Sequence, residues 1–125
     1  MIELIEGLPE GVVAFEAVGE VTSEDYGVVA SRMDRALAKR KRIRLLHVVG
    51  DRFTGHTPSA LLEDTKLGLG KVRSIERIAV VTDLKHFRAL VKGAGWTLPG
   101  ETRLFSNAEL AQAEAWVSEG LNPQA

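Results

Sequence analysis

The sequence contains no cysteine. Disulfides, thiolate nucleophiles, cysteine zinc sites and iron–sulfur clusters are therefore excluded, and the absence fits a reducing compartment. An excess of charge of one sign is also missing, because the formal net charge at pH 7 is only -1. Without a basic excess the chain has no general electrostatic reason to bind nucleic acid, and we expect none as a partner.

Long apolar runs are missing as well. None approaches the ~20 residues needed to cross a bilayer, and the first six residues lack the basic segment of a signal peptide. We therefore expect a cytoplasmic protein with no transmembrane segment, at most in peripheral contact with a membrane. What is present is typical of one folded domain: 125 residues, 45% hydrophobic and 26% charged. We predict a single domain over residues 1–121 and a flexible tail at 122–125.

Two periodicities alternate along the chain. Apolar runs and apolar/polar alternation predict strands. The predicted strands cover residues 2–6, 12–18, 43–49, 77–81 and 102–105. Apolar residues at steps of three and four predict helices that begin near Thr22, Pro58, Asp83 and Ser106, and Glu109 gives the last one a capping box. The order ββαβαβαβα predicts an α/β fold with a mixed, mostly parallel five-stranded sheet and four helices.

Stretches spread over nearly the whole chain resemble the SpoIIAA-like branch of the STAS-like (anti-sigma factor antagonist-like) domain family. They are residues 43–46, 60–68, 75–83, 100–105 and 113–117. The resemblance implies a mixed sheet whose strand–helix units advance as a superhelical coil, and a family without an established enzymatic activity. It also implies two roles. Antagonists of this kind bind a partner kinase and are phosphorylated on a serine at a helix start, and related folds carry lipids or other apolar ligands.

Polar and aromatic residues gather where the predicted strands end, which is where ligands bind in open α/β sheets. Our candidates for binding a ligand or partner are Asp51, Arg52, Phe53, Thr54, His56, Thr57, Asp83, His86 and Trp96. Most of them fall in a predicted loop over residues 50–57. Free amides at the next helix starts suit an anion, and the aromatic rings suit an apolar pocket or a partner surface. Thr57 and Asp83 also suit plain helix capping.

No catalytic motif accompanies these residues. The glycine-flanked serine of hydrolases is missing, and so are phosphate-binding glycine motifs and close histidine spacings for a metal. We therefore expect no metal or cofactor, and we favour a non-enzymatic regulatory module that binds a small apolar or anionic ligand or a regulatory protein. One alternative is a small enzyme that uses His56 or His86 with Asp51.

A second alternative is a phosphorylation-switched regulator resembling an anti-sigma factor antagonist. Its phosphoacceptor would be Thr54, Thr57 or Ser59, whose hydroxyls lie in the region where the resemblance places one. A run of cations within residues 39–44 suits an anionic membrane, although the dipole of the preceding helix already favours cations there. A homodimer through the last helix or the Trp96 segment is also consistent with the sequence.

Overall fold

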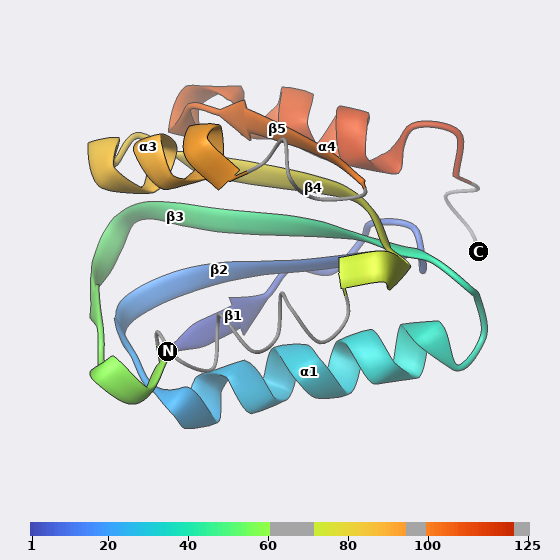
Figure 1. Cartoon of the computed structure of the whole chain (residues 1–125), viewed down its shortest axis with the longest axis horizontal. Coiled ribbons are helices and arrows are strands. Elements are labelled where there is room, and N and C mark those ends of the chain that lie inside the picture. Colours follow the sequence, from blue (N-terminus) through green and yellow to red (C-terminus); the bar gives the residue numbers. More distant parts are fainter. Residues whose placement is uncertain (61–71, 95–99, 122–125) are drawn as a thin grey trace.

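A five-stranded sheet forms the centre of the described chain (Figure 1). The computed structural model describes residues 1–60, 72–94 and 100–121. Its strands are β1 (Ile2–Leu4), β2 (Val12–Val21), β3 (Ile43–His56), β4 (Ile75–Thr82) and β5 (Glu101–Phe105). They lie in the order β1-β2-β3-β4-β5, with β1 antiparallel to β2 and the other neighbours parallel. The predicted mixed, mostly parallel sheet is confirmed.

Helices follow the strands as the sequence predicts. The described ones are α1 (Ser23–Leu37), α3 (Lys85–Ala94) and α4 (Leu110–Ser118), with 3-10 turns at Val72–Ser74 and Asn107–Glu109. Residues 58–60 are also helical, but the rest of the helix predicted from Pro58 lies outside the described residues, as do Trp96 and the tail 122–125. Within the described helices, none is long and apolar enough to span a membrane.

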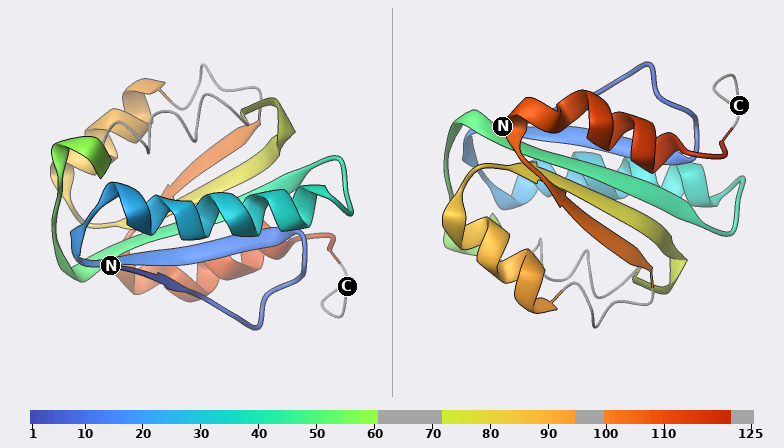
Figure 2. Two further views of the ribbon diagram at one scale, coloured as in Figure 1. Left: turned by 90° about the horizontal axis from the view of Figure 1, so that it is seen from below. Right: turned by 90° about the horizontal axis from the view of Figure 1, so that it is seen from above.

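The sheet separates two apolar cores. Figure 2 shows α1 on one face and α4 on the other. Successive side chains of β2 alternate between the two cores, since Val13 and Phe15 face the α1 core and Ala14 faces the α4 core. Met33 is fully buried on α1, and Trp116 of α4 is buried in the opposite core. The apolar stripe predicted for the last helix is thus used inside the domain, while the homodimer stays a prediction.

The third strand is longer than the sequence predicts. It runs through residues 50–56, so the prediction of a loop there is wrong, and only Thr57 of that segment follows the strand. The reason is that β2 is also longer and pairs with it, up to Val21 opposite His56. Gly19 at φ +61° and Gly55 at φ +152° supply backbone conformations that other residues rarely adopt, where the register shifts. Because β4 ends with Thr82 opposite Val49, residues 50–56 extend past it.

His47 lies within β3 on the face that α1 covers. It stands opposite Phe15 of β2, and the two ring centroids are 4.6 Å apart. The residue keeps some exposed surface, but its Nε2 atom is sealed off and has no hydrogen-bond partner in the described structure. Burial lowers the pKa of His47 from 6.5 to about 4, because the charged imidazolium would lose its hydration.

This buried imidazole makes folding pH-dependent. The unfolded chain takes up a proton at His47 near pH 6.5 and the folded chain only near pH 4, so stability is lost as the pH falls through that window. We expect the free energy of unfolding to drop by about 2 kcal/mol between about pH 7.5 and pH 5 from this group. Urea denaturation at both pH values measures it.

The matched variants are His47→Leu and His86→Leu. The first should remove most of the pH dependence, while the second should keep it, because His86 is exposed. The window stays above the ordinary pKa of carboxyl groups, so acid titration of aspartate and glutamate contributes little. An unchanged pH dependence in the His47 variant would contradict the assignment.

Candidate functional site

A pocket of about 330 Å³ opens at the carboxyl end of the sheet. We call it the carboxyl-end pocket, and its lining residues are Glu16, Val48, Gly50, Asp51, Val81, Asp83, Asn107 and Leu110. Two of the candidates from the sequence, Asp51 and Asp83, are brought together here, and both are exposed. Glu16 was not predicted, because it comes from the middle of a strand. Asn107 stands just after the last strand, where the strand-end rule also applies, but no local pattern links it to Asp51 or Asp83.

A reciprocal pair of hydrogen bonds fixes one wall of this pocket. The Asp83 backbone N–H donates to Asn107 Oδ1, and the Asn107 backbone N–H donates to Asp83 Oδ1, both at 3.0 Å. Asn107 Nδ2 also donates to the Val49 carbonyl at 3.3 Å. The carboxylate of Asp83 therefore ties the end of β4 to the turn before α4. Asp83 also suited helix capping, but before α3 it is the Thr82 hydroxyl that accepts a hydrogen bond from the Leu84 amide, at 3.2 Å.

Four of the amides near this edge already have acceptors. Besides Asp83, Leu84 and Asn107, the Ser106 N–H donates to Glu109 Oε1 at 2.8 Å, which confirms the predicted capping box. That backbone hydrogen bond lowers the pKa of Glu109. The start of α4 is thus satisfied by the chain itself.

Negative charge remains at the rim of the carboxyl-end pocket. Arg52 neutralises Glu16, with its NH2 atom 3.0 Å from Glu16 Oε1, and it also pairs with Glu3 at 2.9 Å. Between described residues no ion pair reaches Asp51 or Asp83. The pocket therefore presents two exposed carboxylates and suits a cationic group better than an anion.

The aromatic candidates pack on the other side of β3. The ring of Phe53 lies 4.9 Å from that of His56 and 5.7 Å from that of Phe87 on α3. The ring of His86 lies 4.6 Å from that of Phe87 at a tilt of 41°. The buried Tyr26 hydroxyl lies 2.9 Å from His56 Nε2. Helical periodicity places Tyr26 on the inward face of α1, but nothing in the sequence indicates its histidine partner.

Asp51 and the two histidines thus occupy different surroundings. Asp51 lines the carboxyl-end pocket, while His56 and His86 both lie beside the ring of Phe87. In the described part of the chain no three histidine, aspartate or glutamate side chains converge as metal ligands. The arrangement adds no support to the enzyme alternative, which requires these groups within hydrogen-bond reach of one another.

The three candidate phosphoacceptors differ in their surroundings. Thr54 is exposed on β3, and Ser59 is exposed within the helical residues 58–60. Thr57 caps that turn, since its Oγ1 accepts the Ala60 amide at 3.2 Å and lies 3.2 Å from Ser59 Oγ. Only Ser59 combines exposure with a position at a helix start, the place that the resemblance implies for phosphorylation.

A mixed five-stranded sheet between helices, with a polar pocket at its carboxyl edge, defines a small α/β domain of the STAS-like class. The family model described as SpoIIAA-like matches residues 12–118, and the chain belongs to that family. An uncharacterised protein of Shewanella loihica PV-4, described as having a SpoIIAA-like fold from the DUF3478 family, is similar in structure, with a TM-score of 0.69. The two are 25% identical, over 94% of this chain and 92% of the other. No curated protein matches the chain.

Proposed function

We propose that the chain is a non-enzymatic regulatory module that binds a protein partner at the carboxyl-end pocket. The observation that carries the proposal is the pair of exposed carboxylates, Asp51 and Asp83, which form no ion pair with any described residue, on a rim that Asn107 holds in place. Because Asn107 already holds the Asp83 carboxylate, that group accepts an arginine or lysine side chain with little further ordering. The family supports the same direction, because SpoIIAA-like antagonists act by binding a protein.

The other occupants predicted from the sequence fit this edge less well. An anion would meet carboxylates and amides that already have acceptors. An apolar ligand would have to bury Asp51 and Asp83 without a counter-charge, which is costly. A basic segment of a partner protein satisfies the carboxylates instead.

Charge reversal tests the proposal. Chemical crosslinking in the native host followed by mass spectrometry identifies the partner, and titration with the purified partner measures its affinity. We expect Asp51→Lys to weaken binding by about tenfold or more, because it sets a cation against the basic segment. Glu101→Lys is the matched control, since Glu101 is equally exposed but begins β5 at the opposite end of the sheet. Equal affinity of the Asp51 variant and the unmodified chain would refute the proposal.

The chain from its native host and the purified partner also test the phosphorylation switch. The position of Ser59 at a helix start favours this alternative. Intact-mass measurement of the chain from its native host shows whether a phosphorylated form exists. A phosphate on Ser59 that abolishes partner binding would make the module a switched regulator of the antagonist kind. Partner binding with no phosphorylated form in any growth phase would leave an unswitched binding module.

A further inference from the structure

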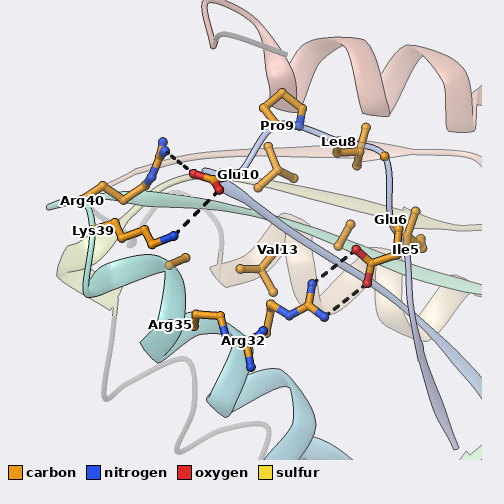
Figure 3. Close-up of a pocket in the computed structure, with 14 residues that line it drawn as sticks. Ile5, Glu6, Leu8, Pro9, Glu10, Val13, Arg32, Arg35, Lys39 and Arg40 are labelled. Carbon is orange, nitrogen blue, oxygen red and sulfur yellow. Dashed lines mark hydrogen bonds and ion pairs between the residues drawn. The ribbon is translucent and has the colours of Figure 1, made fainter. Parts of the chain in front are cut away.

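A second pocket lies at the amino end of the sheet, between the β1–β2 connection and the last part of α1 (Figure 3). Its volume is about 240 Å³, and it shares no lining residue with the carboxyl-end pocket. We call it the amino-end pocket. Four cationic side chains line it, Arg32, Arg35, Lys39 and Arg40, above apolar side chains that include Val13.

Carboxylates neutralise only part of this charge. Arg32 pairs with Glu6 at 3.2 Å, in a two-pronged contact that uses both of its terminal nitrogens. Glu10 is shared by Arg40 at 3.7 Å and Lys39 at 4.0 Å, which are long contacts. Figure 3 shows these two groups on opposite sides of Val13. Arg35 forms no ion pair with any described residue.

Arg40 is positioned by the backbone beneath it. Its NH1 atom lies only 2.6 Å from the place where a Cβ on Gly11 would stand, so the guanidinium uses the space that this glycine leaves open. The side chain of Arg40 is accordingly 27% exposed, whereas that of the neighbouring Lys39 is 67% exposed. The α1 dipole explains cations near its carboxyl end, but it does not explain an arginine folded back over the start of β2.

We infer that the amino-end pocket binds a small amphiphilic anion, with one phosphate or carboxylate group held by Arg35 and Arg40 and a short apolar body against Val13. Guanidinium groups bind the planar or tetrahedral oxygens of such anions in forked geometry. The volume of about 240 Å³ suits a small molecule. This site is independent of the protein-binding function proposed for the carboxyl end.

The experiment uses the full chain titrated with phenyl phosphate, followed by calorimetry and by NMR shifts of the α1 amides. We expect saturable binding that the double variant Arg35→Gln/Arg40→Gln weakens by about tenfold, since charge-assisted hydrogen bonds are lost. The matched control Lys41→Gln/Arg42→Gln removes the same charge from exposed neighbours outside the pocket and should leave the affinity within about twofold. Glu6→Gln should tighten binding several-fold, because it releases Arg32.

Further ligands separate the sources of the anion. Inorganic phosphate should bind more weakly than phenyl phosphate, and benzyl alcohol, which has no charge, should not bind. Absence of saturable binding, equal losses in the two double variants, or equal affinity for phosphate and phenyl phosphate would each overturn the inference. Binding only to vesicles that contain phosphatidylglycerol would overturn it too and would make the cluster a membrane contact.

Discussion

Replacing Gly100 by alanine is expected to destabilise the domain by about 3 kcal/mol, a large share of the total stability of a single domain. Gly100 directly precedes β5, where the chain runs close beside the start of β4. A Cβ at this position would stand 2.5 Å from the Ile75 carbonyl oxygen and 2.7 Å from that of Glu76. Both are backbone atoms that cannot rotate away, so the strand itself must shift. Urea denaturation followed by circular dichroism measures the loss.

Gly27→Ala is the matched control for this prediction, because it adds the same methyl group elsewhere. Gly27 lies within α1, and nothing stands within 4 Å of its would-be Cβ. That variant should stabilise the domain by about 1 kcal/mol through helix propensity. Opposite signs for the two substitutions are the expected result, and a Gly100 variant as stable as the unmodified chain would contradict the close approach of β4 and β5.

Local periodicity was sufficient to predict the order of strands and helices, since each strand and helix shows its own pattern of apolar residues. It was not sufficient for the length of β3. Gly50, Asp51 and Gly55 are typical turn residues, yet they continue a strand because β2 extends beside them. Strand pairing is set by a neighbour far away in sequence, which single-sequence patterns do not report.

The candidate site shows the same division. The rule that ligands bind at carboxyl ends of strands placed Asp51 and Asp83 at the same edge of the sheet, and both line one pocket. It did not separate Phe53 and His56 from them. Asp51 and Phe53 would share one face of a regular strand, and the register shifts beside them depend on the pairing with β2. Asn107, which fixes the pocket wall, also follows a strand end, but its hydrogen bonds to Asp83 span 24 residues and no local pattern indicates them.

The two ends of the sheet carry opposite charge. Two carboxylates that pair with no described cation, Asp51 and Asp83, line the carboxyl-end pocket, while cations outnumber carboxylates in the amino-end pocket. α4 runs along one face and is anchored at each end, by Asn107 near its start and by arginines of β3 and β4 near its finish. The geometry of the carboxyl-end pocket therefore depends on the packing of α4. Replacing Arg44, which holds the end of α4 farthest from that pocket, tests how α4 is anchored.

Arg44→Met is expected to destabilise the domain by about 3 kcal/mol, because it leaves the Val117 and Glu119 carbonyls at the end of α4 without the arginine donor. Arg44 is 8% exposed, which is rare for an arginine. Its NH1 atom donates to the Val117 carbonyl at 3.0 Å and to the Glu119 carbonyl at 2.6 Å, and its Nε donates to Glu76 at 2.9 Å. Methionine keeps the length of the buried stem but offers nothing to those carbonyls. Urea denaturation again measures the change.

Two companions identify which contact matters. Arg42→Met alters an exposed arginine in the same segment and should change stability by less than about 0.5 kcal/mol. Glu76→Gln removes only the ion pair, and because the Glu76 side chain is 43% exposed, solvent screening should keep its cost below about 1 kcal/mol. If Glu76→Gln instead costs as much as Arg44→Met, the ion pair and not the capping of α4 holds this end of the helix. The expected order, with Arg44→Met far the largest, follows from the buried Val117 carbonyl, where water does not replace the guanidinium.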